Sequence, residues 1–187
     1  MMLQRIIPRE RGKFIHRYDL VYQLEDGQEK VYEIISRRED LTTPEDLRGR
    51  DVDAVVIIAT DASGDRILLN REFRMAVGEP VFSFPAGLME PGETFEEAAA
   101  RELWEETGLE LYAVEDQIGV SYSAVSFGNE RNVCIVGRAR GTIRPSTLPA
   151  EEIQGGWYGR EEVRKLLQTE LFAARTQAYL YVWSRQT

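Results

Sequence analysis

Three glutamates with helical spacing are the residues of this chain best suited to chemistry. Glu102, Glu105 and Glu106 follow Ala98 and Ala99 in a segment whose pattern predicts a helix. At about 100° per residue, Glu102 and Glu106 fall on the same face as the two alanines, and Glu105 falls near its edge. The face that should pack against the rest of the fold therefore continues as carboxylates.

Buried carboxylates that lie side by side repel one another, and an ionised carboxylate in an apolar site is rarely tolerated without compensation. A bound cation would resolve this, and carboxylate oxygens are hard ligands that suit Mg²⁺ or Mn²⁺ better than zinc. The alternative is that the glutamates are solvated charges, as most acidic runs on helices are. The two alanines at the start of the same face count against this alternative.

A helix from Thr94 to Thr107 must position these carboxylates. Thr94 is a suitable N-cap with Glu97 as its reciprocal partner, and Gly108 is a typical stop. The apolar run at 53–59 predicts a central strand. Shorter strands are predicted at 67–69, 81–84, 119–123, 132–137 and 155–158, and two helices at 160–167 and 173–184. Strands surrounding a few helices predict a mixed α/β fold.

The first 50 residues have a different pattern. Segments 17–24 and 30–36 alternate like strands about a turn at 25–28, which predicts a β-hairpin. The polar stretch 38–46 is the best candidate for a boundary. We therefore expect an N-terminal hairpin segment over 1–50 and a main domain over 51–187.

Composition excludes several classes of protein. The chain has 32 acidic and 23 basic residues, a net charge of −9 that argues against general nucleic-acid binding. The only cysteine is Cys134 and the only histidine is His16, so neither a disulfide framework nor a multi-histidine metal centre is expected. No apolar run is long enough to span a membrane or to act as a secretory signal. A cytoplasmic location is predicted.

The acidic helix belongs to a longer pattern. Gly87, Glu93, Arg101-Glu102-Leu103, Glu105-Glu106 and Gly108-Leu109 resemble the Nudix box at every defined position. The resemblance covers the chain from about Asp53 to its end. It implies a Nudix-type α/β/α sandwich, with the N-terminal antiparallel β-hairpin as an extension. It also implies hydrolysis of a nucleoside diphosphate linked to another group.

The same resemblance implies roles for individual residues. In this family the corresponding positions bind divalent metal, which points to Glu102, Glu105, Glu106 and the backbone carbonyl of Ala86. The first glutamate of the box and its arginine usually pair to hold the loop on the helix, so Glu93 and Arg101 are expected to be structural. Gly87 would let the backbone approach the metal closely, because it has no Cβ.

The general base is expected outside the helix. Glu130 is similar in placement to the loop glutamate that acts as the base in the ADP-ribose pyrophosphatase branch. A solvent-exposed acid is an equally simple interpretation of Glu130, and Glu105 or Glu106 could supply the base instead. Arg71 and Arg74 resemble an arginine stretch of that branch, and the planar guanidinium suits phosphate. Both could alternatively pair with surface acids.

These features predict a small nucleotide substrate, with ADP-ribose, cleaved to AMP and ribose 5-phosphate, the first choice. The branch typically has a Pro-Gly pair where this chain has Val125 and Ser126, so GDP-mannose, a dinucleoside polyphosphate or an oxidised nucleoside triphosphate stay open. A non-catalytic nucleotide sensor is the alternative of another class. By resemblance we expect a homodimer, with Tyr18, Tyr22 and Tyr32 either stacking on adenine or packing in the core.

Overall fold

The chain divides into two compact units. The computed structural model describes residues 1–49, 51–147 and 152–186. The first unit is Met1–Ala54 together with Val120–Asn132, and the second is Val55–Gly119 together with Val133–Thr187. The first unit thus contains Glu130, and the second contains the acidic helix. Each unit is described by itself below.

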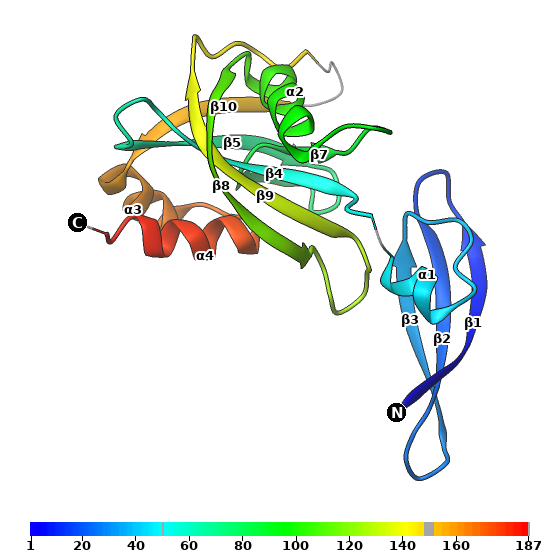
Figure 1. Ribbon diagram of the computed structural model, residues 1–187. Helices are drawn as coiled ribbons and strands as arrows, with labels where there is room; N and C mark the ends of the chain where they lie inside the picture. The colour runs from blue at the N-terminus through cyan, green and yellow to red at the C-terminus, as the bar shows by residue number, and fades with distance from the viewer. Residues whose placement is uncertain (50, 148–151, 187) are drawn as a thin grey trace. The chain divides into compact units, whose positions relative to one another are not determined.

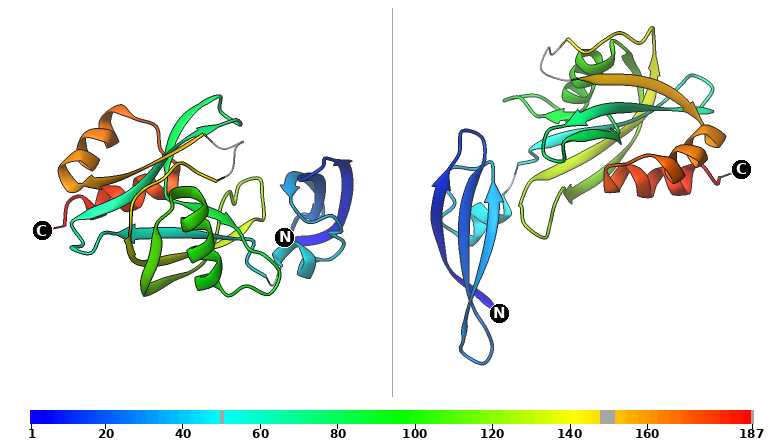
Figure 2. Two further views of the ribbon diagram at one scale, coloured as in Figure 1. Left: turned by 90° about the horizontal axis from the view of Figure 1, so that it is seen from above. Right: turned by 180° about the vertical axis from the view of Figure 1, so that it is seen from behind.

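The second unit is built around a β-sheet. Its strand order is β10-β5-β4-β9-β8, with β6 paired to β5 and β7 paired to β4. Helix α2 covers one face of this sheet, and α3 and α4 cover the other (Figures 1 and 2). The elements are β4 (Ala54–Thr60), β5 (Arg66–Arg74), β6 (Glu79–Ser83), β7 (Ala86–Leu88), α2 (Phe95–Thr107), β8 (Glu110–Tyr122), β9 (Arg131–Arg140), β10 (Ile153–Gly159), α3 (Arg160–Thr169) and α4 (Ala174–Trp183).

Alternation along the central strands fills both faces. On β4, Val56 and Ile58 join the core cluster that contains Val163 of α3 and Leu180 of α4. The residues between them, such as Ile57, are equally buried and point to the opposite face, because successive side chains of a strand alternate. The sheet is therefore sandwiched between helices, and the expected α/β/α architecture is confirmed.

Helix α2 begins and ends where its sequence predicts. Thr94 accepts a hydrogen bond from the Glu97 backbone N–H, and the Glu97 carboxylate accepts one from the Thr94 N–H. Gly108 ends the helix in the left-handed conformation (φ 72°), and its N–H donates to the Trp104 carbonyl. These local contacts fix which turn of the helix carries each glutamate.

The first unit contains a three-stranded antiparallel sheet in the order β1-β2-β3, formed by β1 (Met2–Arg11), β2 (His16–Gln23) and β3 (Glu29–Ser36). The hairpin of β2 and β3 is present as expected, whereas β1 was not predicted. The burial of β1 does not alternate, and its pairing with β2 is interrupted by two register shifts. A strand without period-2 patterning gives no clear sequence signal.

The stretch expected to be a polar boundary folds back onto this sheet. It contains α1 (Pro44–Arg48), which Thr43 caps with a reciprocal bond to Asp46. Hydrogen bonds from Thr43 lower the pKa of Asp46 to about 2. Tyr18, Leu20, Ile34 and Leu41 form the core of this unit. Within the described residues, no helix has the length and apolar character that crossing a membrane requires.

Candidate active site

The glutamates of α2 differ sharply in exposure. Glu102 and Glu106 are only 8% and 6% exposed, and they share the buried face with Ala98 and Ala99. Glu105 lies at the edge of this face, with 34% of its side chain exposed. The arrangement of these glutamates around the helix therefore agrees with the one inferred from their spacing. Two carboxylates are buried one turn apart.

Gly87 lies directly against the first of these carboxylates. A Cβ built on Gly87 would overlap the carboxyl group of Glu102, so any larger residue would displace one of them. Two residues earlier, the carbonyl of Pro85 accepts a hydrogen bond of 2.8 Å from the Ile57 N–H, which ties this segment to β4. The missing side chain thus lets the backbone of β7 approach the acidic face of α2.

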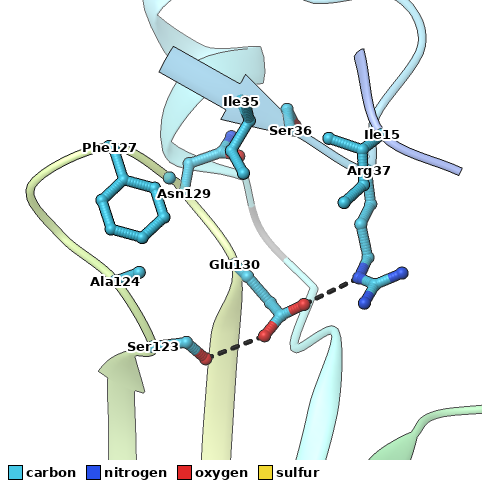
Figure 3. Close-up of a pocket in the computed structure, with 10 residues that line it drawn as sticks. Ile15, Ile35, Ser36, Arg37, Ser123, Ala124, Phe127, Asn129 and Glu130 are labelled. Carbon is cyan, nitrogen blue, oxygen red and sulfur yellow. Dashed lines mark hydrogen bonds and ion pairs between the residues drawn. The ribbon is translucent and has the colours of Figure 1, made fainter. Parts of the chain in front are cut away.

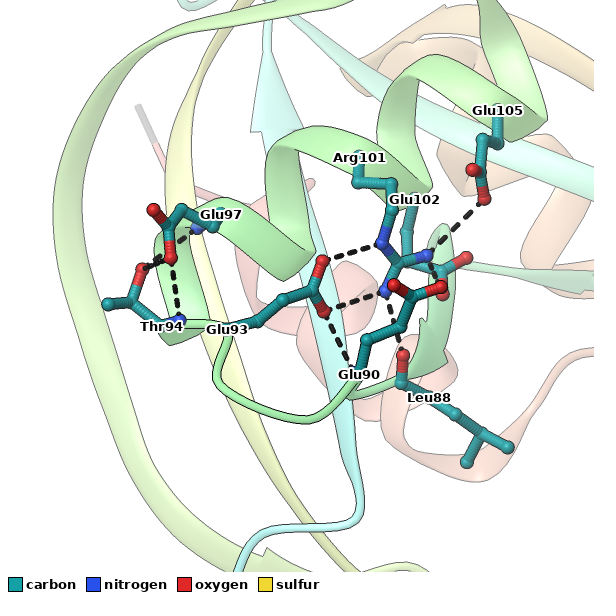
Figure 4. A network of polar contacts seen from close by, with 8 residues as sticks. All are labelled: Leu88, Glu90, Glu93, Thr94, Glu97, Arg101, Glu102 and Glu105. Carbon is teal, nitrogen blue, oxygen red and sulfur yellow. Dashed lines mark hydrogen bonds and ion pairs between the residues drawn. The ribbon is translucent and has the colours of Figure 1, made fainter.

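Arg101 is the centre of a polar network between the loop and the helix (Figure 4). Its Nε donates to Glu93 Oε1 at 2.7 Å and its Nη2 to Glu93 Oε2 at 2.9 Å, a bidentate pair. Nη2 also donates to the Leu88 carbonyl at 2.9 Å, while Nη1 donates to Glu102 at 2.8 Å and to Glu105 at 3.3 Å. Arg101 thereby ties the loop to the helix.

The pKa values in this network follow from the pairing. The hydrogen bonds from Arg101, and then the Glu90 backbone N–H, lower the pKa of Glu93 to about 2. The same bond to Glu93 raises the pKa of Arg101 above its already high value, against the opposing effect of burial. Both groups therefore stay charged across the physiological pH range. Glu93 and Arg101 contact each other as the sequence led us to expect.

Glu106 receives a hydrogen bond from the sheet. The side-chain Nδ2 of Asn70, on β5, donates to Glu106 Oε2 at 2.7 Å. Asn70 is 1% exposed and lies on the sheet face that carries α2. This contact joins a buried carboxylate to a buried amide, an arrangement that stabilises the charged carboxylate in an apolar environment.

The carboxylates are held by protein groups in this structure. Among the described residues, no group of three His, Cys, Asp or Glu side chains is arranged to hold a metal ion. Glu102 and Glu105 contact Arg101, and Glu106 contacts Asn70. The chemistry of the set nevertheless suits a hard divalent cation, because its donors are carboxylate oxygens and the glycine leaves room for close approach of the backbone.

Glu130 has its own environment in the first unit (Figure 3). Its Oε2 accepts a hydrogen bond of 2.7 Å from Arg37 Nε, and its Oε1 accepts one of 2.9 Å from Ser123 Oγ. It lines a cavity of about 160 Å³ whose other walls include Ile35 and Phe127. A carboxylate with this exposure, 32% of its side chain, is accessible to solvent and fixed by two partners.

Arg71 and Arg74 are not brought together. Arg74 is paired with Glu72 at 2.8 Å and is half-exposed. Arg71 lies three positions before Arg74 on the same strand, so its side chain points to the opposite face. There its charge acts on Tyr158, which packs on the core under α3 and α4. Successive strand residues point to opposite faces, so Arg74 shares the face of Asn70 and Arg71 does not.

The tyrosines of the first unit have two different environments, the core and a cavity. Tyr18 is 1% exposed in the core, and its hydroxyl donates to the carbonyls of Arg38 and Glu39. For Tyr18 the core alternative is therefore confirmed. Tyr22 and Tyr32 instead line a cavity of about 330 Å³ together with Tyr122.

Three contacts in these surroundings were not predicted. Asn70 contacts Glu106 and Arg37 contacts Glu130, as described above. In addition, Thr176 of α4 accepts a hydrogen bond of 3.1 Å from the Phe84 N–H, at the start of the segment that leads to Gly87. A polar Asn70 at the end of the apolar run Ile67–Leu69 was the one visible signal. Nothing local marks Arg37 or Thr176.

Comparison with known proteins assigns the family. A family model, described as NUDIX domain, matches residues 50–180. Nudix hydrolase 19, chloroplastic, of Arabidopsis thaliana is 37% identical over 134 residues, which are 68% of this chain and 30% of that protein. An ADP-sugar pyrophosphatase of Mus musculus is 30% identical over 146 residues, 75% of this chain and 64% of that protein. This chain spans less than two thirds of either relative.

The fold agrees with this assignment. The crystal structure of an ADP compounds hydrolase matches with a TM-score of 0.74 and 21% identity, covering 97% of this chain and 92% of that chain. At this identity the match concerns the fold. The chain belongs to the Nudix hydrolase family, so the predicted family, fold and enzyme class are confirmed.

Proposed function

We propose that this chain is a divalent-metal-dependent hydrolase that cleaves the diphosphate of ADP-ribose to AMP and ribose 5-phosphate. The observation that carries the proposal is the buried carboxylate pair, Glu102 and Glu106, of which Glu102 lies directly against the backbone of Gly87. Membership of the Nudix family and the 30% identity with an ADP-sugar pyrophosphatase support the substrate class.

In this proposal the acidic side chains of α2 hold the metal. Glu102, Glu105 and Glu106 are its carboxylate ligands, with the carbonyl of Ala86 as a further oxygen donor. A bound Mg²⁺ or Mn²⁺ supplies positive charge to the phosphate oxygens and lowers the pKa of bound water. Arg101 and Glu93 keep the loop and the helix in fixed relation, since their bidentate pair is charged at every physiological pH.

The remaining roles belong to groups that bind substrate or move a proton. A water oxygen forms a bond to one phosphorus, the bridging P–O bond breaks, and the bridging oxygen leaves with the other phosphate. Glu130 accepts the proton of the water, a role consistent with a partly exposed carboxylate in a cavity. Arg74 binds phosphate oxygens, and we assign Arg71 a lesser part because it points to the other face of the sheet.

The N-terminal segment contributes to substrate binding and to assembly. Residues 1–50 form the segment to which we assign these roles, and 51–187 form the hydrolase domain. The cavity lined by Tyr22 and Tyr32 has aromatic walls suited to a nucleobase.

Light scattering after size-exclusion chromatography tests the predicted homodimer. The cytoplasmic location stays a prediction.

A product assay tests the reaction. The purified chain is incubated with Mg²⁺ or Mn²⁺ and one of four substrates: ADP-ribose, GDP-mannose, a dinucleoside triphosphate or an oxidised nucleoside triphosphate. The expected result is AMP and ribose 5-phosphate in equal amounts, with one atom of ¹⁸O from labelled water in one product. Faster turnover of another substrate would contradict the assignment of ADP-ribose. Binding without turnover of any of the four would favour a nucleotide sensor.

A further inference from the structure

Asn70 is a polar residue in an otherwise apolar part of the central sheet. The three residues before it on β5, Ile67, Leu68 and Leu69, are completely buried, and Asn70 itself is 1% exposed. Asparagine is disfavoured inside strands, where branched and aromatic residues pack better. The sequence therefore gives up packing at this position, which is typical of residues that are kept for function.

The orientation of the Asn70 amide follows from its neighbour. An ionised carboxylate only accepts hydrogen bonds, so the amide must turn its NH₂ group toward Glu106, and it does so at 2.7 Å. The amide oxygen then points elsewhere and has no hydrogen-bond partner in the described part of the chain. A buried acceptor without a donor is unfavourable. The Asn70 amide thus donates to Glu106 while its oxygen is left without a hydrogen bond.

The strand next to Asn70 leaves space for this arrangement. Gly155 of β10 is its cross-strand partner, and a Cβ on Gly155 would lie 3.3 Å from the amide oxygen and 3.3 Å from Thr107. A contact of that length is tight, so a larger residue at 155 would press on the amide. The absence of a side chain at Gly155 thus leaves room for the Asn70 amide that donates to Glu106.

We propose that Asn70 is a positioning residue, which fixes the Glu106 carboxylate in the orientation required for divalent-metal binding. The inference rests on the proposed function, because it assigns Glu106 to the metal. Partners of this kind orient metal-binding side chains by hydrogen bonding, and their loss typically lowers metal affinity or activity by about 10- to 100-fold. Asn70 touches neither substrate nor metal in this role.

Ser83 provides a matched control on the other side of β5. It is the cross-strand partner of Asn70 on β6, it is 5% exposed, and its hydroxyl has no hydrogen-bond partner within the described residues. Ser83→Ala therefore removes a buried polar group beside Asn70 without removing a contact to Glu106. An effect of general repacking would appear in both variants.

The test measures metal binding without turnover. Mn²⁺ is titrated into wild type, Asn70→Leu and Ser83→Ala, and free Mn²⁺ is followed by electron paramagnetic resonance. We expect Asn70→Leu to bind Mn²⁺ about 10- to 100-fold more weakly and to lose kcat by a similar factor. The substrate KM is expected to stay near the wild-type value, because no substrate contact is removed. Ser83→Ala should match wild type in all three quantities.

A folded Asn70→Leu with wild-type Mn²⁺ affinity and kcat would overturn the inference. Circular dichroism and the thermal midpoint establish that the variant is folded. If Asn70→Leu does not fold, Asn70→Asp decides instead, since it keeps the shape but replaces the donor with an oxygen. Its kcat should fall at least tenfold, a scale set by the loss of one such partner, and an unchanged kcat would contradict the role. An inactive wild type would contradict the proposed function itself, which is a separate outcome.

Discussion

The two faces of the central sheet are built from the same strands but differ in the polarity of the side chains that cover them. The face under α3 and α4 is mainly apolar, with Val163, Leu180 and Trp183 packed on β4 and β5. The face under α2 starts with Ala98 and Ala99 and ends with Glu102, Glu106 and Asn70. The first face serves mainly packing, whereas the second replaces apolar packing with buried carboxylates, and there we place the reaction.

The largest expected effect comes from removing one charge on the α2 face. Glu106→Gln keeps the shape of the side chain and an oxygen that can accept from Asn70, so the fold should be retained. We expect kcat to fall by more than about 100-fold, because loss of even an outer partner of a metal ligand reaches that scale. Steady-state kinetics with Mg²⁺ measures it, and Glu96→Gln on the exposed side of α2 is the control. Full activity of Glu106→Gln would remove it from the proposed metal site.

The opposite face should respond in stability and not in chemistry. Leu180 is fully buried, so Leu180→Ala leaves a cavity and should lower the free energy of unfolding by about 2–5 kcal/mol. Urea denaturation measures this loss. Leu180→Met, which nearly conserves volume, should lose less than about 1.5 kcal/mol. The kcat of the folded protein should stay unchanged in both variants, and a kcat loss as large as that of Glu106→Gln would end the proposed division between the faces.

A smaller effect is expected at the start of α2. Thr94→Ala removes the hydroxyl that accepts from the Glu97 N–H and should lower the free energy of unfolding by about 1 kcal/mol. Thr94→Ser keeps the hydroxyl and should stay near wild type. The same urea denaturation distinguishes the two, and equal losses would mean that the methyl group and not the cap matters.

The parts of the fold that were predictable are those with local signals. The limits of α2 follow from Thr94, Glu97 and Gly108, which act within a few residues of the helix ends. The β2–β3 hairpin follows from alternation about a short turn. Strand β1 escaped prediction because its pairing is interrupted and its burial does not alternate. Strand β7, with three residues, is too short to carry a pattern.

The surroundings of the candidate site were less predictable, because the contacts join residues far apart in the chain. The buried face of α2 was visible in the spacing of its glutamates. Asn70 and Glu106 are 36 positions apart, and Arg37 and Glu130 are 93 apart. Such pairs depend on which strands become neighbours, and no local pattern encodes this. Side-chain spacing thus indicated which carboxylates are buried, and the fold was needed to show what holds them.

The smallest expected effect concerns pH and the pair that joins the loop to α2. The pKa of Glu93 is about 2 in the folded protein, below its ordinary 4.5, because Arg101 stabilises the charged form. A lowered pKa in the folded state means that the contribution of Glu93 is fully present above about pH 4.5. It is lost as the pH falls from there toward 2. The charge on Arg101 does not change in this range.

Glu93→Gln separates this contribution from the rest of acid unfolding. The thermal midpoint of wild type should exceed that of Glu93→Gln by a constant amount from pH 7 to about pH 5, and the difference should shrink below about pH 4.5 as Glu93 is protonated. The exposed Glu96→Gln provides the baseline for a charge change on the same helix. A difference that persists undiminished at pH 3 would mean that shape, and not the charged bidentate pair, holds the loop against α2.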